Sequence, residues 1–296
     1  MTTPSFSTLD FSVAEGIATI TFNRPESHNS MTVAMCHDMH DAMDLADGDD
    51  DIRVVIVTGA GSNFCVGADL DEGFISSEGR LSDATLAYLE RAGQINGVPR
   101  DGGGFISLRI AQSLKPVIGA IRGAAVGVGI TMTLPMDIRI VSDDARAGFV
   151  FARRGLVPEA ASSWFLPRIV GISKAMEWVA TGRLIDADEM TASGLASYCV
   201  PRDDVLIKAQ EIARQIADNT SGVAVAASRQ LMWGMLGRSS PWDAHALDSR
   251  LVYDLAGQGD VKEGVQAFLE KRPARFPLTV SNDLPAYLSN WASAPT

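Results

Sequence analysis

Cysteine is scarce in this chain, and its three cysteines form no pattern. Cys36, Cys65 and Cys199 are widely spaced, odd in number and include no Cys-x-x-Cys pair. This spacing argues against a disulfide framework and a structural zinc site, and it favours a reducing, cytoplasmic location. Because the sequence contains no run of about 18 apolar residues, we also expect no membrane span.

Positive charge and histidine are also in short supply. The chain has 25 Lys and Arg residues against 36 Asp and Glu residues, a formal net charge of −11. Nucleic acid is therefore not expected as the main partner, because binding its phosphates needs concentrated Lys and Arg. A phosphorylated small molecule needs only a few basic residues and is compatible with this charge. His37 and His40 lie three residues apart with no third ligand near in sequence, so we predict no metal site.

The order of apolar segments predicts an α/β fold. A hairpin is expected over residues 8–23, a helix over 32–46 and a buried strand over 53–58, and strands then alternate with helices to about residue 150. We expect residues 71–108 to be a partly helical, mobile cover over a site or a plain solvated connection.

From about residue 172 the periodicity becomes helical. We therefore divide the chain into a core over residues 1–202 and a C-terminal helical region over 203–296. The predicted helices run over 173–180, 186–193, 205–218, 223–236, 243–255 and 261–271.

Two strands are each followed by a glycine-rich turn. Residues 63–70 (Asn-Phe-Cys-Val-Gly-Ala-Asp-Leu) follow the strand at 54–59, and residues 122–129 (Arg-Gly-Ala-Ala-Val-Gly-Val-Gly) follow a second strand at 115–121. Two such turns can point two backbone N–H groups at one oxygen, which is an oxyanion hole. The alternative is that both turns are only tight packing points. A dinucleotide fingerprint is disfavoured because the GxGxxG spacing fails at Met132.

These turns belong to a longer series of motifs that resembles the crotonase (enoyl-CoA hydratase/isomerase) superfamily. The resemblance implies an α/β, ClpP/crotonase-like core of ββα spiral turns, a C-terminal helical trimerisation region, and assembly as a homotrimer or hexamer. It also implies an acyl-CoA substrate, with coenzyme A as part of that substrate and no separate cofactor. Besides the turns, the motifs are Ile20–Glu26, His28–Met31, Gly155–Glu159, Leu166–Arg168, Thr181–Arg183 and Phe268–Pro273.

Matching the family position by position places the oxyanion N–H donors at Ala68 and Val128. Typical hydratases also carry two glutamates that hold one water, and here the matching positions are Thr131 and Phe151. Neither side chain is a carboxylate, so hydration by two glutamates is not expected.

Glu159 is the carboxylate that remains in this region of the sequence. Its position resembles that of the single catalytic glutamate of peroxisomal-type Δ3,Δ2-enoyl-CoA isomerases. One carboxylate can take a proton from C2 and return it to C4, and an apolar environment would raise its pKa. The structural alternative is that Glu159 caps a turn or pairs with Arg153 or Arg154.

The resemblance also suggests residues that bind the rest of the substrate. The CoA-binding candidates are Arg24, His28, Cys65, Val66, Phe268 and Lys271. The alternative for Arg24 is a salt bridge with Glu26, and the alternative for His28 is an ordinary position in a loop. For Phe268 and Lys271 the alternative is a solvated helix face. The acyl-pocket candidates are Phe74, Tyr88, Thr131 and Phe151. For the three aromatic residues among them, the alternative is simple packing in the core. Asp69 is expected to orient its loop rather than reach the substrate.

Three functions follow from these residues. The first is an enoyl-CoA isomerase that uses Glu159 as proton shuttle. The second is an enoyl-CoA hydratase in which Glu159 and another polar group such as Thr131 orient a water. The third is an acyl-CoA-binding subunit without catalysis, which would be favoured if Glu159 were buried against an arginine away from the oxyanion turns. The glycine-rich turns would persist under all three hypotheses.

Overall fold

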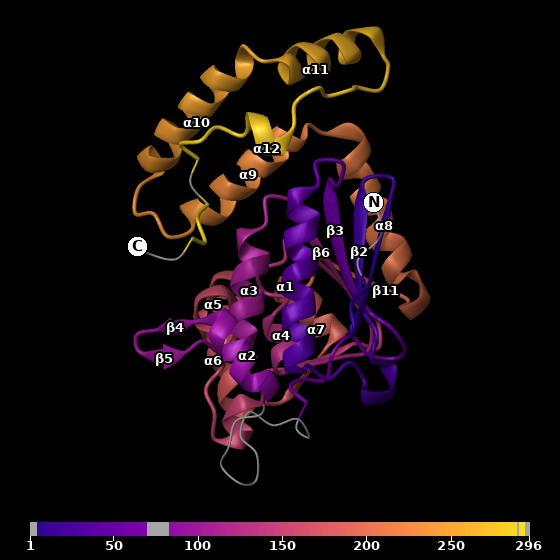
Figure 1. Cartoon of the computed structure of the whole chain (residues 1–296), viewed down its shortest axis with the longest axis vertical. Helices are drawn as coiled ribbons and strands as arrows, with labels where there is room; N and C mark the ends of the chain where they lie inside the picture. The colour runs from indigo at the N-terminus through magenta and orange to yellow at the C-terminus, as the bar shows by residue number, and fades with distance from the viewer. Residues whose placement is uncertain (1–4, 70–82, 289, 294–296) are drawn as a thin grey trace.

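The computed structural model describes residues 5–69, 83–288 and 290–293, and its centre is a six-stranded sheet (Figure 1). The strand order is β1-β2-β3-β6-β8-β11, with β1 antiparallel to β2 and all other neighbours parallel. The strands are β1 (Leu9–Ala14), β2 (Ile17–Phe22), β3 (Val54–Gly59), β6 (Val117–Ile121), β8 (Ile138–Ser142) and β11 (Tyr198–Val200).

The predicted hairpin at residues 8–23 is confirmed. Its two-residue loop consists of Glu15 and Gly16, both with positive φ. Two positive φ values give a turn whose twist matches that of the flanking strands. The next strand, β3, is buried at every position, as expected for a central parallel strand covered on both faces.

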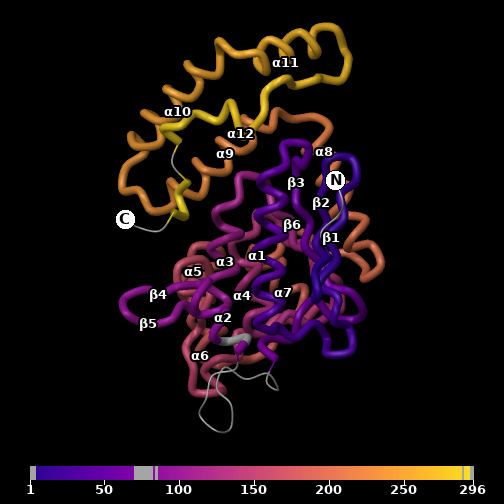
Figure 2. The backbone as a smooth tube through the Cα atoms, viewed as in Figure 1, coloured from indigo at the N-terminus to yellow at the C-terminus, as the bar shows by residue number. Residues whose placement is uncertain are grey.

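Helices cover both faces of this sheet. On one face lie α1 (Val33–Gly48) and α3 (Gly102–Gln112), and on the other lies α8 (Val205–Asn219), whose apolar residues pack on β3, β6 and β8. Since α8 follows residue 202, a helix beyond the predicted core boundary supplies the second layer. Figure 2 traces the same layers as a tube.

A smaller three-stranded sheet has the strand order β10-β9-β7. Its strands are β7 (Ala124–Val126), β9 (Arg146–Gly148) and β10 (Leu184–Asp186). The short helices around it are α4 (Val128–Thr131), η2 (Val150–Arg154), α5 (Ser162–Val170), α6 (Ile172–Thr181) and α7 (Ala187–Ala192). Strand β7 is followed directly by α4, and strand β9 is followed directly by η2.

The segment at residues 71–108 is only partly described. Its first part, through residue 82, lies outside the described residues. The rest forms α2 (Asp83–Ala92), a hairpin of β4 (Gln94–Ile95) and β5 (Val98–Pro99), and the start of α3. The glycines at 102–104 form the first turn of a buried helix.

The C-terminal helices form an arm beyond the end of the sheet (Figure 1). They are α9 (Gly222–Met235), α10 (Pro241–Ala256), α11 (Gly259–Glu270) and α12 (Val280–Asp283). Several large apolar side chains on the arm are exposed, among them Met232, Trp242, Tyr253 and Phe268. Within the described residues, no helix is both long and apolar enough to cross a membrane.

Candidate active site

The two glycine-rich turns lie directly against each other. Cys65 forms a parallel bridge with Ala125, and the N–H of Val126 donates to the carbonyl of Cys65 at 3.0 Å. A Cβ on Gly129 would overlap that same carbonyl oxygen. The absence of a side chain at this glycine is therefore what allows the two backbones to approach so closely.

The predicted oxyanion donors, Ala68 and Val128, both have amide groups without an acceptor in the described part of the chain. The bridge between residues 31 and 68 uses the carbonyl of Gly67 and the N–H of Asp69, which leaves the N–H of Ala68 unused. Val128 begins α4, and the first N–H of a helix has no partner within the helix. Both turns also carry a glycine with positive φ, +113° at Gly67 and +57° at Gly127.

Glu159 lies beside α4, the helix that supplies the second of these amides. Thr131 donates its hydroxyl to Oε1 of Glu159 at 2.5 Å, and the same hydroxyl lies 3.2 Å from the carbonyl oxygen of Gly127. The other oxygen, Oε2, is buried and receives no hydrogen bond from the described residues. Helix α5 fixes the backbone, since the N–H and hydroxyl of Ser162 donate to the Glu159 carbonyl at 3.0 and 2.6 Å.

A second carboxylate, missed in the sequence analysis, approaches Glu159. Asp101 is the N-cap residue of α3, and its Oδ1 accepts hydrogen bonds from the N–H groups of Gly104 at 2.5 Å and Ala160 at 3.1 Å. A Cβ on Gly103 would overlap Oε2 of Glu159. An Asp directly before a helix is a known N-cap signal, but the three glycines that follow it favour a loop.

Burial is the main influence on the protonation of Glu159, and it raises the pKa of this carboxyl to about 8. The hydroxyl of Thr131 lowers the pKa of Glu159, whereas the charge of Asp101 and a side-chain contact with it raise it further. No arginine or lysine pairs with Glu159 in the described residues. Arg153 instead donates to the carbonyl of Thr181 at 2.9 Å. The proposed salt bridge to Arg153 or Arg154 is thus absent from this part of the structure.

Asp69 and Arg24 form an ion pair behind the first glycine-rich turn. Nη2 of Arg24 lies 3.0 Å from Oδ2 of Asp69, and Ser30 donates to the same oxygen at 2.8 Å. Asp69 therefore orients its loop, as expected from the sequence. The guanidinium of Arg24 is engaged by Asp69 instead of Glu26, and its contact with CoA phosphates stays a prediction.

The remaining CoA candidates occupy different surroundings. His28 is exposed, and its Nδ1 lies 3.1 Å from Nδ2 of Asn63. Val66 is half-buried, whereas the Cys65 side chain is fully buried and its thiol has a pKa raised to about 12 by that burial. Phe268 and Lys271 lie at the end of α11, which is far from α4 in the same chain (Figure 1).

The acyl-pocket candidates are described in part, because Phe74 lies outside the described residues. Tyr88 is buried, donates its hydroxyl to the carbonyl of Arg100 at 3.0 Å and packs edge-on against Phe105. Phe151 is half-buried on η2 and packs on the main core. Thr131 is buried against Glu159. Among the described acyl-pocket candidates, Thr131 is the one with a hydrogen bond to the carboxyl of Glu159.

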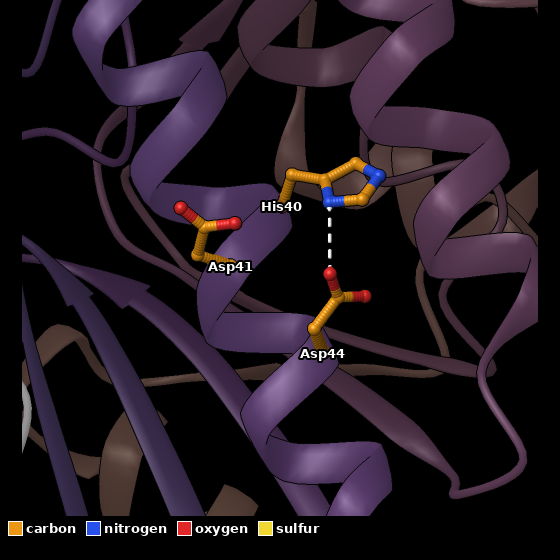
Figure 3. Close-up of side chains that lie close together, drawn as sticks. All are labelled: His40, Asp41 and Asp44. Carbon is orange, nitrogen blue, oxygen red and sulfur yellow. Dashed lines mark ion pairs between the residues drawn. The ribbon is translucent and has the colours of Figure 1, made fainter. Parts of the chain in front are cut away.

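The one group of possible metal ligands found in the described residues is on α1. His40, Asp41 and Asp44 lie close together there, with Nδ1 of His40 3.3 Å from Asp44 (Figure 3). Two arginines already neutralise the carboxylates, since Arg91 pairs with Asp41 and Arg109 with Asp44. The ring of His40 also stacks on Phe105. The cluster is thus explained as an ion-pair network that joins α1, α2 and α3.

Comparison with known proteins identifies the class that this fold and site define. The family described as enoyl-CoA hydratase/isomerase matches residues 12–278. Enoyl-CoA hydratase ACTT3 of Alternaria alternata is 42% identical over 268 residues, which are 90% of this chain and 85% of that protein. The 1,2-epoxyphenylacetyl-CoA isomerase of Escherichia coli (strain K12) is 32% identical over 272 residues, 89% of this chain and 96% of that protein.

Solved structures agree with this assignment. A probable enoyl-CoA hydratase/isomerase from Mycobacterium abscessus superposes with a TM-score of 0.79 and 31% identity, covering 90% of this chain and 98% of that one. A putative enoyl-CoA hydratase from Streptomyces coelicolor A3(2) gives a TM-score of 0.81 at 27% identity, covering 93% and 96%. The chain therefore belongs to the enoyl-CoA hydratase/isomerase family of crotonase-fold enzymes.

Proposed function

We propose that this enzyme moves the double bond of an enoyl-CoA thioester, with Glu159 as its only proton shuttle. The observation that carries the proposal is the buried carboxyl of Glu159, which lies against the helix whose first N–H is an unused oxyanion donor. The positions where hydratases carry glutamates hold Thr131 and Phe151. A single carboxylate with a raised pKa suits removal of a proton from one carbon and its return to another.

The reaction can be written with this chain's own groups. The carboxylate of Glu159 takes a proton from C2, and the electron pair moves into the thioester carbonyl to give an enolate oxygen. The N–H groups of Ala68 and Val128 stabilise that oxygen; loss of one such donor costs about 10²–10³ in rate. The electron pair then returns through the carbon chain as Glu159 delivers the proton to C4. No water is consumed.

Hydration of a 2-enoyl-CoA is the second candidate. It is favoured by the hydroxyl of Thr131, which lies 2.5 Å from Oε1 of Glu159 and could help that carboxylate to orient a water. The name of the Alternaria relative points to the same activity. The binding-only alternative is disfavoured because Glu159 lies beside the oxyanion turns and pairs with no arginine in the described residues.

The substrate and assembly complete the proposal. An acyl-CoA would place its thioester between the two turns, and α11 of a neighbouring copy in a homotrimer or hexamer would contribute Phe268 and Lys271. The position of α11 far from its own α4, and its exposed apolar side chains, support this arrangement (Figure 1). A cytoplasmic location is part of the same proposal.

A paired assay distinguishes these functions. Purified enzyme receives a trans-3-enoyl-CoA or a trans-2-enoyl-CoA, and the products are separated by chromatography and weighed by mass spectrometry. Conversion of the 3-enoyl to the 2-enoyl ester is expected, with a loss of about 10²–10⁴ in the Glu159→Gln variant. Glu211→Gln, an exposed carboxylate on α8, is the control. If the 2-enoyl ester gains the mass of one water and no isomerisation occurs, the isomerase proposal is contradicted and the hydratase is favoured.

A further inference from the structure

We propose that Asp101 is a positioning residue for Glu159, and that the two carboxyl groups share one proton in the free enzyme. The inference deepens the proposed function, because it rests on Glu159 as the group that moves the proton. Asp101 is not assigned a step on the substrate. It acts through the turn that carries Glu159 and through its own negative charge.

The first observation is the place where Asp101 lies. It caps α3 by accepting from Gly104, and the same Oδ1 accepts from the N–H of Ala160, the residue directly after Glu159. One carboxylate oxygen therefore joins the first turn of α3 to the turn that aims the catalytic carboxyl. Residues 101 and 160 are 59 positions apart, so this link is purely tertiary.

The second observation is strain in the turn that Asp101 holds. Ala160 and Ala161 both have left-handed backbone conformations, with φ of +64° and +52°. For a residue with a Cβ this conformation is unfavourable, because the Cβ crowds the following carbonyl oxygen. Two in succession persist only where the surroundings fix them. The hydrogen bond from Ala160 to Asp101 is one such restraint, and Ser162 supplies another at the carbonyl of Glu159.

The third observation is that one carboxyl oxygen of Glu159 lacks a hydrogen-bond partner in the described residues. Its Oε2 is buried and receives no N–H or O–H from the described residues, and it lies against Gly103 on the first turn of α3. Asp101, two residues before Gly103, raises the pKa of Glu159 both through its charge and through a side-chain hydrogen bond between the two carboxyl groups. Two carboxylates can form such a bond only if one of them holds a proton, because ionised carboxylates accept and do not donate. A shared proton therefore satisfies the contact.

The surroundings favour keeping this proton. Among the described residues, the titratable groups that interact with Glu159 include Asp101 at the start of α3, Cys65 in the first glycine-rich turn and Tyr88 on α2, and none of these three is a cation. Two like charges at close range in a buried site disfavour double ionisation. The pair is thus expected to carry one negative charge near neutral pH and to lose its proton only in more alkaline solution.

The test replaces Asp101 by Asn, which removes the charge but keeps an oxygen for Gly104 and Ala160. Asn caps helices as well as Asp does, so the fold of α3 should be retained. Protonation of Glu159 is followed in the free enzyme by infrared difference titration of the carboxylic acid band, with Glu159→Gln as the spectral reference. We expect the titration midpoint of Glu159 to fall by about one pH unit or more in Asp101→Asn.

The pH profile of kcat/KM gives the second readout. In Asp101→Asn the rising limb should shift to lower pH, and the plateau rate should fall roughly three- to tenfold because a base of lower pKa is weaker. Asp101→Ala should lose more rate, since it also removes the acceptor for Ala160. A purely structural role for Asp101 would leave the infrared midpoint of Asp101→Asn unchanged, and that result would overturn the proposal.

The two readouts keep the proposal separate from the proposed reaction. The infrared titration needs no substrate, so it tests the carboxyl pair even if the enzyme proves to be a hydratase. If Asp101→Asn shifts the titration midpoint of Glu159 but neither enoyl ester reacts with the unmodified enzyme, the shared proton is supported and the proposed reaction is wrong. If isomerisation depends on Glu159 but the midpoint does not move in Asp101→Asn, the proposed reaction is supported and the shared proton is wrong.

Discussion

At the scale of single residues, the site depends on what surrounds one carboxyl group. One oxygen of Glu159 accepts from a hydroxyl and the other receives no donor from the described residues, and its pKa of about 8 follows from burial and from nearby Asp101. The sequence indicated the direction of this shift through the apolar neighbours of Glu159. It did not indicate Asp101, because a residue 58 positions earlier contributes to the environment only after folding.

The raised pKa of Glu159 makes a prediction about stability. The folded protein holds this proton more tightly than the unfolded chain, whose ordinary value is 4.5. The stability gained from this proton is fully present below pH 4.5 and is lost as the pH rises through about 8. Glu159→Gln has no proton to lose there, so at pH 9 it should exceed the unmodified enzyme in unfolding free energy by on the order of 2–4 kcal/mol.

Urea unfolding at pH 5, 7 and 9 measures this difference. The gap between Glu159→Gln and the unmodified enzyme should widen with each step in pH. The exposed carboxylate variant Glu211→Gln serves as control and should show no such trend. A gap that is the same at all three pH values would contradict the raised pKa of Glu159. Because only the ionised form is a base, kcat/KM should likewise rise with pH up to about 8.

At the scale of elements, the start of α3 is where the structure departs most from the sequence pattern. Glycines at 102–104 disfavour a helix, because glycine weakens a helix by about 1 kcal/mol relative to alanine. The helix forms nevertheless, with Asp101 as its cap and with Gly103 and Gly104 against the carboxyl groups of Glu159 and Asp101. The glycines thus make room for the site, and tertiary packing overrides their local preference.

This packing predicts an unusual result for Gly103→Ala. Alanine favours the helix by about 1 kcal/mol, but its Cβ would overlap Oε2 of Glu159 and displace the carboxyl. We expect the rate to fall by about 10²-fold or more, approaching the loss in Glu159→Gln. Thermal unfolding and kcat/KM measure the two effects. Gly48→Ala in α1, where nothing lies within 4 Å of a new Cβ, is the matched control and should keep full activity. Full activity in Gly103→Ala would show that the carboxyl lies elsewhere.

At the scale of the whole molecule, the body and the C-terminal arm have different surfaces. The sheet buries its apolar residues between α1, α3 and α8. The arm instead leaves large apolar side chains exposed, including Trp242, Tyr253 and Phe268. Exposed apolar surface of this kind marks an interaction site, and it supports the proposed association of copies through the arm.

The proposed reach of α11 into a neighbouring copy makes a prediction for Phe268. Its side chain is 82% exposed, so Phe268→Ser should not change the stability of a single subunit. If the ring contacts the CoA of a neighbour, KM should rise about 3–30-fold while kcat changes little, because the interaction binds substrate and transition state alike. Urea unfolding measures the stability, and steady-state kinetics measure KM and kcat. Ile207→Ser, at a similarly exposed residue on α8, is the control. An unchanged KM in Phe268→Ser would remove this residue from the proposed site.

The sequence by itself determined the regular elements and the chemistry that is available. The hairpin at residues 8–23, the helix that begins after Thr32 and the helices beyond residue 172 follow from local periodicity and capping, so they were predictable within a few residues. The two glycine-rich turns and the acidic side chain of Glu159 were also visible in the sequence.

Only the tertiary structure decided which of these groups meet. Thr131 comes from α4, and Asp101 and Gly103 come from the start of α3; folding brings both places to Glu159. The partner of Arg24 was likewise Asp69 instead of its sequence neighbour Glu26. The physical reason is that hydrogen bonds, burial and charge act over a few ångströms in space, whatever the separation along the chain, so sequence neighbours do not reveal a side chain's environment.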